Sequence, residues 1–367
     1  MNRMQKKILL LCGLSSYVVH FRLGLIAALQ ARGLKVSVVA FDEEYAQEIR
    51  KVGVDFYCLK DSNRSINVFK VLSLKKRYAK VIKEVAPNYV FTFMLKPNIF
   101  GTLAARKVGV EQIYSMVEGA GDVFINQSLK WKAIRFFVAR YYKKAFNYSQ
   151  KVFFLNDEDK KEFINRGLVK DEQTIIVRGI GVDLQKFQQK SLKNNTSFLM
   201  IARMLKTKGV MEYCKAAKIV KNQYPRARFC YLGAEGSVKI SDIREYIDAG
   251  IVEYLGVTKD VRPYLEDCAV YVLPSYREGL PMSIMEAEAV GRMIVTTSAI
   301  GCKDTVIEGY NGYLVEPKNE YDLAQKLMGL LENPEEILRM GENSRRFAED
   351  HFDQDRINAF ICEKMGI

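Results

Sequence analysis

Histidine is nearly absent from this chain, which has two histidines among 367 residues. Such a composition offers few of the nitrogen ligands that transition-metal sites use. Cysteine occurs seven times, an odd number, and no pair has the CxxC spacing. This pattern argues against a disulfide framework and against a zinc site, and it predicts free thiols in a reducing cytosol.

Long uncharged stretches are missing too, since the longest, residues 8–21, has 14 residues. That length is too short to span a bilayer. The N-terminal sequence MNRMQKKILLLCGLSS has the basic start and short apolar run of a signal peptide. A helical pattern over 20–32 and a second strand follow directly, however. We therefore predict that the stretch is the first strand of an α/β domain, which enters a turn at Gly13.

The charge is unevenly distributed along the chain. The sequence has 56 basic and 43 acidic residues, a net charge of +13. Nearly all of the excess falls in residues 60–151, which hold 18 basic and 5 acidic residues. Such asymmetry indicates that one domain faces a polyanion, either an anionic membrane or a nucleic acid. A basic surface that serves only solubility is the alternative.

Strand-like and helix-like segments alternate throughout, and the series runs twice. The length exceeds that of a single core, so two domains are expected. We predict an α/β fold of two Rossmann-like, doubly wound domains that face a cleft, with ligands at the carboxyl ends of the strands. The predicted parts are a first Rossmann-like domain (1–178), a linker (179–196), a second Rossmann-like domain (197–345) and a C-terminal helix (346–367) that crosses back to the first domain.

Two glutamates bracket the uncharged run GLPMSIM in the sequence SYREGLPMSIMEAE. Glu278 follows the strand pattern VYVLPS, and a helix is expected to begin near Pro281. Glu286 then falls on the helix face that turns back toward the same opening. The main-chain N–H groups at the start of such a helix bind anions. One segment can thus offer acceptors for sugar hydroxyls and donors for a phosphate.

Two cations follow the first strand of the second domain, in the sequence IARMLKTKG. Arg203 and Lys208 there suit a diphosphate at the mouth of a parallel sheet, although solvated loop charges are the simpler alternative. The one Asp-x-Asp, formed by Asp157 and Asp159, is interpreted as a helix cap with first-turn acids in preference to a metal site. Either glutamate of the preceding segment could likewise only cap a helix.

Taken together, these segments indicate a protein family far more specifically than any one of them does alone. The order ARMLKTKG, YLG, SYREGLPMSIMEAEAVG and EGYNGYLVEP, from about Ser197 to Pro317, resembles the retaining glycosyltransferases of family four, which have the GT-B fold. The sequence GIGVD at 179–183 resembles the crossover between the two domains of that family. The resemblance implies a UDP-sugar donor, retention at the anomeric carbon by front-side attack, and neither a cofactor nor a metal.

The resemblance also implies roles for individual residues. Glu286 would hold the donor ribose, and Glu278 would hold the donor sugar beside the reacting centre. Arg203 and Lys208 would neutralise the departing diphosphate, as a divalent ion does in other enzymes. The base would lie near 256–260, with Thr258 as the candidate. The remaining donor contacts would come from Gly279, Leu280, Pro281 and Met282.

The first half resembles a narrower group of the family. The sequences SSYVVHFRLGLIAAL, LKPNIFGTLAARKVGV and SMVEGAGDVF resemble the bacterial transferases that extend undecaprenyl-diphosphate-linked sugars. The nearest type adds N-acetylgalactosamine through an α-1,3 linkage, as in bacterial protein N-glycosylation. This resemblance implies a polyprenyl-diphosphate-linked saccharide as acceptor, in protein glycosylation, O-antigen or capsule assembly.

Candidate acceptor contacts come from this half. Glu118, just after the strand QIYSMV, could orient or deprotonate an acceptor hydroxyl, or it could be a turn residue satisfied by the local backbone. His20 could contact an acceptor phosphate, although a satisfied core histidine is an equal alternative. Ser16 belongs to the same segment. Lys96 and Asn98 follow the next strand and are further candidates.

Residues 129–148 alternate basic and aromatic side chains, and residues 69–85 form a second basic stretch. An amphipathic helix of this composition fits the headgroup region of an anionic bilayer, although an ordinary helix packed on a sheet also shows an apolar stripe. We predict peripheral attachment to the cytoplasmic face of the inner membrane. The proposed membrane contacts are Lys130, Trp131, Lys132, Arg135, Lys143 and Lys144.

Three other functions fit parts of the pattern. A nicotinamide-dependent dehydrogenase shows similar alternation, but GAGDVF (119–124) and GIGVDL (179–184) both lack the third glycine of the dinucleotide fingerprint. A UDP-sugar epimerase can share the two-domain fold and needs no membrane surface. A nucleic-acid-binding protein would explain the charge but not the paired glutamates.

Overall fold

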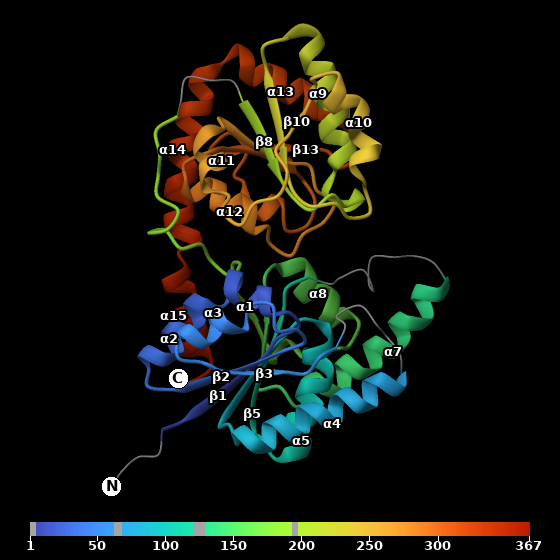
Figure 1. Cartoon of the computed structure of the whole chain (residues 1–367), viewed down its shortest axis with the longest axis vertical. Coiled ribbons are helices and arrows are strands. Elements are labelled where there is room, and N and C mark those ends of the chain that lie inside the picture. Colours follow the sequence, from blue (N-terminus) through green and yellow to red (C-terminus); the bar gives the residue numbers. More distant parts are fainter. Residues whose placement is uncertain (1–4, 62–67, 120–128, 193–196) are drawn as a thin grey trace. The chain divides into compact units, whose positions relative to one another are not determined.

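The computed structural model describes residues 5–61, 68–119, 129–192 and 197–367, with the backbone alone in 68–72 and 129–133. The chain divides into two compact units (Figure 1). The first comprises residues 1–180 and 355–367, and the second comprises residues 181–354.

The described part of the first unit contains seven strands, which alternate with helices as predicted. They form one parallel sheet in the order β3-β2-β1-β4-β5-β6-β7. The N-terminal apolar run is β1, the central strand, as predicted in place of a signal peptide. The strands are β1 (Lys7–Leu11), β2 (Lys35–Ala40), β3 (Asp55–Cys58), β4 (Tyr89–Phe93), β5 (Gln112–Val117), β6 (Lys151–Phe154) and β7 (Thr174–Ile176).

Helices cover both faces of this sheet (Figure 1). One layer contains α4 (Val68–Val85), a π-helical turn η1 (Pro97–Gly101), α5 (Thr102–Val108), α7 (Leu129–Phe146) and α8 (Asp157–Asn165). The other contains α1 (Ser15–Phe21), α2 (Leu23–Ala31), α3 (Ala46–Lys51) and the C-terminal α15 (Gln354–Lys364). Tyr114 on β5 donates a hydrogen bond to the Met365 carbonyl at 2.8 Å. The predicted return of the C-terminal helix to the first domain is thereby confirmed.

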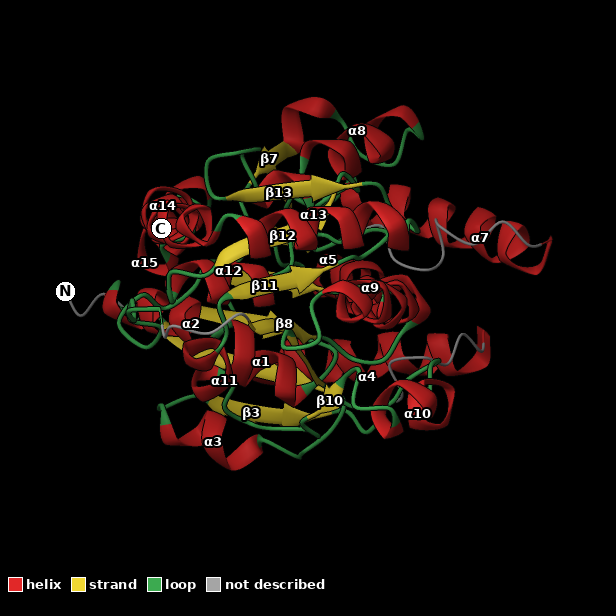
Figure 2. Cartoon of the chain, turned by 90° about the horizontal axis from the view of Figure 1, so that it is seen from above, coloured by secondary structure: helices red, strands yellow, loops and turns green. Residues whose placement is uncertain are grey.

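The second unit repeats the plan with six parallel strands, in the order β10-β9-β8-β11-β12-β13 (Figure 2). The strands are β8 (Ser197–Ile201), β9 (Arg228–Leu232), β10 (Glu253–Tyr254), β11 (Val270–Leu273), β12 (Met293–Thr297) and β13 (Gly312–Val315). The helices are α9 (Val210–Gln223), α10 (Ile240–Asp248), α11 (Arg262–Asp267), α12 (Met282–Ala289), α13 (Glu320–Glu332) and α14 (Pro334–His351).

The unit boundaries differ from the predicted ones. Segment 179–196 was predicted as a linker, but from Gly181 onward its described part belongs to the second unit. The reason is that Val182 pairs with the end of the second unit. Its N–H donates to the Phe352 carbonyl, and its carbonyl accepts from the Gln354 N–H. The C-terminal helix begins at Gln354 and not at 346, since α14 ends at His351.

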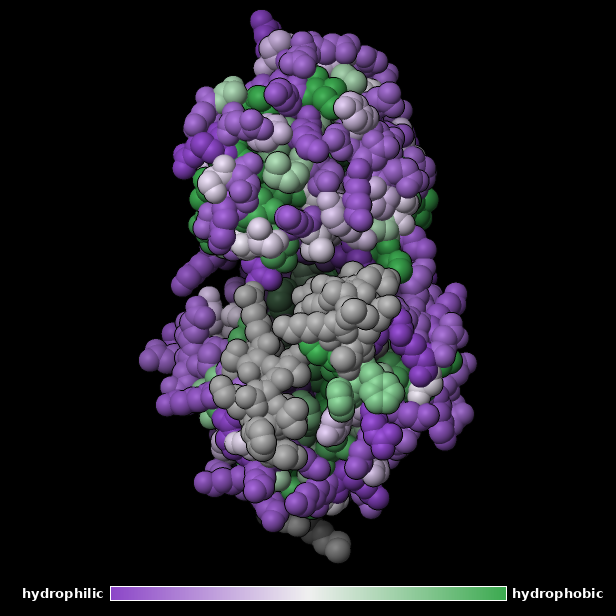
Figure 3. Space-filling model, turned by 90° about the vertical axis from the view of Figure 1, so that its right-hand side faces the viewer, coloured by the Kyte–Doolittle hydropathy of each residue, from purple (hydrophilic) through white to green (hydrophobic). Residues whose placement is uncertain are grey.

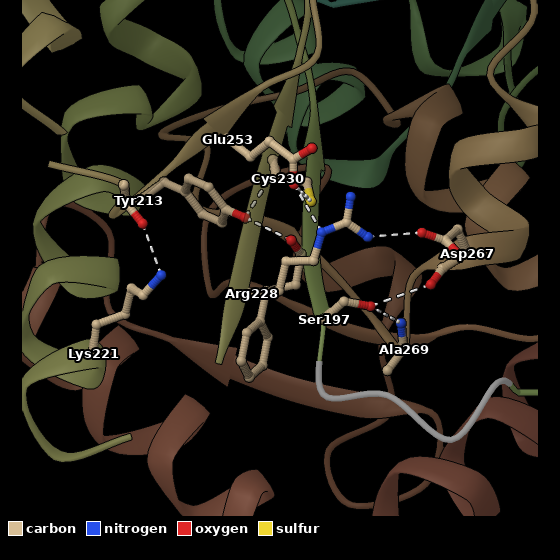
Figure 4. Close-up of polar contacts among 10 residues, drawn as sticks. Ser197, Tyr213, Lys221, Arg228, Cys230, Glu253, Asp267 and Ala269 are labelled. Atoms are coloured by element: carbon tan, nitrogen blue, oxygen red, sulfur yellow. Dashed lines mark hydrogen bonds and ion pairs between the residues drawn. The ribbon is translucent and has the colours of Figure 1, made fainter. Parts of the chain in front are cut away.

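Arg228 closes the amino edge of the second sheet (Figure 4). Its guanidinium donates to Glu253 and to Asp267, both at 2.8 Å, and so ties β9 to β10 and α11. A cavity of about 390 Å³ lies beside these residues. It opens at the amino ends of the strands, opposite the edge where parallel sheets bind ligands.

No helix in the described part of the chain is both long and apolar enough to cross a membrane. All seven cysteines are free, as predicted.

Candidate active site

Two loops at the carboxyl edge of the second sheet are held tightly together. Gly209, after β8, has a φ of +75°, and a Cβ atom there would overlap the Pro274 carbonyl after β11. The Thr207 carbonyl accepts hydrogen bonds from the Tyr276 N–H at 2.8 Å and from the Ser275 hydroxyl at 2.9 Å. Glycine is needed because only it fits both the backbone conformation and the space.

This closure brings together two residues predicted from separate motifs. Lys208 Nζ lies 2.5 Å from Glu278 Oε1, and the Ser275 hydroxyl donates to the same oxygen at 2.6 Å. The Glu278 N–H donates to the Ile300 carbonyl at 2.9 Å, which fixes the main chain beneath the carboxylate. Both side chains remain partly exposed. The Lys208 ammonium and the Glu278 carboxylate therefore lie next to each other at the carboxyl ends of β8 and β11.

Glu286 lies on α12, on the side of the same site. The hydroxyl of Tyr271 on β11 donates to the Ile201 carbonyl at 3.0 Å. Burial raises the pKa of this hydroxyl, and the charges of Glu286 and Glu278 raise it further. Both carboxylates therefore lie near Tyr271. That both glutamates serve one site stays a prediction.

The protonation of Glu286 is unusual. Burial raises the pKa of its carboxyl from 4.5 to about 7, while Lys186 opposes the shift and Asp260 adds to it. Sequence reasoning missed Lys186, because it lies in the segment interpreted as a linker and belongs to no recognisable motif.

The other donor-site candidates vary in their surroundings. Arg203 is exposed in the loop after β8. The Thr258 hydroxyl is engaged in a turn, since it donates to the Asp260 carbonyl at 3.0 Å and accepts from the Asp260 N–H at 3.1 Å. That use is local, and it weakens the interpretation of Thr258 as a base. Gly279 and Leu280 precede Pro281, which occupies the N-cap position of α12. The helix begins at Met282, next to the start near Pro281 that the sequence predicts.

A third glutamate, Glu288, connects α12 to the loop before β13. Glu288 is fully buried, and its Oε1 accepts a hydrogen bond at 2.8 Å from Asn311, in the loop before β13. Burial holds the pKa of this carboxyl well above its usual range. Neither residue was singled out from the sequence, because their pairing spans 23 residues. Glu288 therefore supports the helix that carries Glu286.

The first unit presents Glu118 at the carboxyl end of β5. Arg22 forms an ion pair with Glu118 Oε1, and the Tyr17 hydroxyl donates to the same oxygen. Glu118 is therefore more than a turn residue satisfied by local backbone. Arg22 and Tyr17 were missed although both lie in a quoted segment, because nothing in a sequence reveals contacts about 100 residues apart.

Two neighbouring candidates lie on α1. Ser16 is partly exposed, whereas Ser15 is buried and hydrogen-bonded to Asp42. His20 is exposed in the last turn of α1, with the Tyr45 ring 5.7 Å away. The histidine is thus not a core residue.

Lys96 and Asn98 need correction as acceptor contacts. Asn98 is buried; its amide donates to the Met116 carbonyl and accepts from the Thr92 hydroxyl, both at 2.7 Å. Lys96 is 5% exposed and is ion-paired with Asp61 at 3.4 Å. Both side chains serve the interior of the first unit.

Helix α7 divides into a buried and an exposed face. Val138, Tyr142, Ala145 and Phe146 are buried, so part of the apolar pattern is core, as the alternative interpretation held. Phe136 and Phe137 are exposed by 69% and 62%, and Figure 3 shows apolar side chains on this face. Of the predicted membrane contacts, Lys143 and Lys144 are exposed and Arg135 is half-buried. The side chains of Lys130, Trp131 and Lys132 lie outside the described residues.

The Asp-x-Asp segment is a helix cap, as predicted. The Asn156 side chain caps α8 by accepting from the Asp159 N–H at 2.7 Å, with Asp157 in the first turn. Across the described ranges, no cluster of three or more histidine, cysteine, aspartate or glutamate residues could hold a metal ion.

Sequence profiles of glycosyltransferases match both halves of the chain. The profile "Glycosyl transferases group 1" matches residues 182–347, and "Glycosyl transferase 4-like" matches residues 7–156. The chain is 32% identical to the N,N'-diacetylbacillosaminyl-diphospho-undecaprenol α-1,3-N-acetylgalactosaminyltransferase of Campylobacter jejuni, over 90% of this chain and 91% of that protein. The chain belongs to this family of glycosyltransferases.

Further similarities agree with this assignment. The glycosyltransferase is 27% identical to an Escherichia coli UDP-Gal:α-D-GlcNAc-diphosphoundecaprenol α-1,3-galactosyltransferase, over 69% of this chain and 68% of that protein. It superposes on Anabaena HepE, solved with UDP and glucose, with a TM-score of 0.79, 18% identity and coverage of 98% and 99%. The predicted GT-B fold is confirmed, and the dehydrogenase, epimerase and nucleic-acid-binding alternatives are set aside.

Proposed function

We propose that the glycosyltransferase moves N-acetylgalactosamine from UDP-N-acetylgalactosamine to a saccharide carried on undecaprenyl diphosphate, with retention at the anomeric carbon. The observation that carries this proposal is the pairing of Lys208 with Glu278 beside Glu286 at the strand ends. The named activities of the Campylobacter jejuni and Escherichia coli relatives support the choice of a lipid-diphosphate acceptor.

Each residue of the pair has a role in the proposed reaction. Lys208 leaves Glu278 to meet the donor diphosphate, and Arg203 adds a second cation. Glu278 is then free to accept hydrogen bonds from the donor sugar, and Glu286 accepts them from the ribose. The anomeric carbon–oxygen bond breaks toward UDP, which keeps the electron pair. The acceptor oxygen bonds to that carbon from the same face, and its proton passes to the departing phosphate oxygen.

Metal independence is part of the proposal. Two side-chain cations within one loop supply the charge that a divalent ion supplies elsewhere. Assay of the purified protein with a panel of UDP-sugars and a lipid-linked acceptor, with and without chelator, tests this directly. We expect UDP-N-acetylgalactosamine to be the preferred donor, an α-configured product by NMR, and unchanged rates in chelator. A β-configured product, or activity restored only by Mg²⁺, would contradict the account.

Donor binding should depend on pH through Glu286. An ionised carboxylate accepts two ribose hydroxyls better than a protonated one, and the pKa of Glu286 is raised to about 7. Affinity should therefore be constant above pH 8 and fall as the pH drops through 7, by about tenfold between pH 8 and pH 6. Calorimetry with uridine, which carries no titrating phosphate, measures this.

The matched variant is Glu286→Gln. Its uridine affinity should be weak and independent of pH over the same range. If the wild-type affinity stays flat from pH 8 to pH 6, Glu286 does not bind the ribose as a carboxylate.

The surface of α7 supports docking on the cytoplasmic face of an anionic membrane. The exposed Phe136 and Phe137 lie on the same helix as the exposed Arg140, Lys143 and Lys144. Burial and the charges of Lys107 and Lys144 lower the pKa of Lys75 on α4, so basic groups of three helices gather here. Aromatic side chains enter the headgroup region while cations bind its phosphates, at about 1 kcal/mol for each basic residue.

Charge reversal at Arg140, Lys143 and Lys144 should release the protein from vesicles that contain anionic lipid. We expect at least about a tenfold loss of vesicle binding in flotation, because three side chains that attract the anionic headgroups are replaced by side chains that repel them. Reversal of Lys218, Lys239 and Arg244, exposed on the second unit, is the control and should leave binding intact. Equal binding by both triple variants would refute the assignment of this surface.

A further inference from the structure

A buried arginine lies at the carboxyl edge of the first unit's sheet. Arg22 joins α1 to α2, and its side chain is fully excluded from solvent. Its guanidinium lies 5.0 Å from the centre of the Tyr17 ring and 4.4 Å from that of Phe93. Among the residues that the structure describes, its Nη1 has no hydrogen-bond partner. Burying an incompletely satisfied cation is costly, so the remaining bonds of Arg22 must serve a purpose.

Apart from a contact of Nη2 with Met116 Sδ at 3.3 Å, those bonds lead to one oxygen of Glu118, directly or through Tyr17. Arg22 Nε donates to the Tyr17 hydroxyl at 2.8 Å, and Nη2 donates to that hydroxyl and to Glu118 Oε1. The Tyr17 hydroxyl in turn donates to Oε1. Within the described ranges, every hydrogen bond to this carboxylate goes to Oε1. Glu118 is 20% exposed, the most accessible member of the trio.

We propose that Arg22 and Tyr17 are positioning residues for the transfer reaction, which fix Glu118 so that its Oε2 accepts a hydrogen bond from the acceptor hydroxyl as the acceptor binds. The proton of that hydroxyl passes to the departing phosphate oxygen only as the new bond forms. This inference rests on the proposed function, because only transfer to a hydroxyl requires such a group. A carboxylate anchored through one oxygen keeps the lone pairs of the other for a ligand. The Tyr17 hydroxyl and Arg22 Nη2 both donate to Oε1 and so hold the carboxylate in place, and a fixed acceptor aligns the nucleophilic oxygen.

A second buried arginine shows what a purely structural role looks like. Arg292, just before β12, is also fully buried with an unpartnered Nη1. Its bonds go to main-chain carbonyls, those of Leu265 at 2.8 Å, Lys190 at 3.1 Å and Glu266 at 3.4 Å. Arg292 therefore joins backbone segments at the amino edge of its sheet. Arg22 instead holds a side chain that reaches solvent at the carboxyl edge.

Kinetics of the full-length variants test the positioning role. Tyr17→Phe and Arg22→Met should each lower kcat at least about tenfold, whereas the Kd for UDP, which the second unit binds, should stay within about twofold. Glu118→Gln should lower kcat at least as far. The double variant Arg22→Met/Glu118→Gln should be no slower than Glu118→Gln, because Arg22 acts through Glu118.

Arg292→Met is the matched control. Arg292→Met and Arg22→Met should both lower the melting temperature. Only Arg292→Met should leave kcat per folded molecule unchanged. The inference is wrong if Arg22→Met keeps kcat within twofold, if the losses from Arg22→Met and Glu118→Gln multiply, or if Arg22→Met also loses UDP binding. Lack of transfer by the wild-type protein would overturn the proposed function together with this inference, so that assay comes first.

Discussion

Replacing Lys208 with alanine should lower kcat/KM for sugar transfer by about 10²–10³-fold, the usual loss when a fixed charge-stabilising group is removed. Lys208 is the cation nearest the carboxylate of the donor site, with Nζ 2.5 Å from Glu278 Oε1. In the proposed reaction the departing diphosphate gains negative charge in the transition state, and Lys208 is the group that meets this charge. Release of UDP in the presence of the lipid-linked acceptor measures the loss. Glu278→Ala should have a comparable effect.

Lys215→Ala is the control for this prediction. Lys215 forms a similar pair with Glu320 at 3.1 Å, but on the exposed side of α9. Its removal should leave turnover unchanged, because surface ion pairs contribute little. The assigned role of Lys208 fails if Lys208→Ala keeps near-normal turnover with an unchanged melting temperature.

Gly209→Ala should abolish activity through geometry alone. The added Cβ would overlap the Pro274 carbonyl and push apart the loops that carry Lys208 and Glu278. We expect turnover to fall at least about a hundredfold, since displacing catalytic groups by 1 Å costs this much. Transfer kinetics together with thermal unfolding measure both consequences.

Gly250→Ala separates the overlap from backbone strain. Gly250 has a φ of +64°, similar to the +75° of Gly209, but a Cβ there has no neighbour within 4 Å. The control should lose only about 1–2 kcal/mol of stability, the cost of a left-handed backbone. If both variants behave alike, contact with Pro274 is not what makes Gly209 necessary.

The fold was predictable because buried parallel strands are nearly continuous apolar runs. The thirteen strands of the described residues alternate with helices in two series, as the sequence predicts, and β1 to β7 share one sheet. The unit boundaries were not predictable. Gly181 and Val182 look like linker, yet Val182 pairs with residues 352 and 354, far along the chain.

The proposed donor site could be predicted from the sequence because its residues fall in two short motifs. Lys208 and Glu278 follow strands β8 and β11, which are neighbours in the sheet, so their meeting follows from topology. Lys186 and Glu288 were missed because their partners are set by tertiary packing. Lys186 lies in no motif, and Glu288 lies at the end of the segment SYREGLPMSIMEAE, which does not show that its side chain turns inward.

Burial of polar residues accounts for the errors at the acceptor side. Asn98 lies in the π-helical turn η1, where its amide satisfies core groups and does not face solvent. Lys96 is likewise held by Asp61. Sequence position places both at a strand end, but it does not reveal which way a side chain turns.

Calorimetric titration of UDP and uridine in chelator, into the wild-type protein and Lys208→Ala, tests most directly whether side chains receive the diphosphate. Wild-type protein should bind UDP at least about tenfold more tightly than uridine, the gain from charge-assisted bonds to phosphate. Lys208→Ala should bind both ligands with nearly the uridine affinity of the wild type. If UDP binds both proteins equally tightly, or binds tightly only when Mg²⁺ is added, Lys208 does not hold the diphosphate.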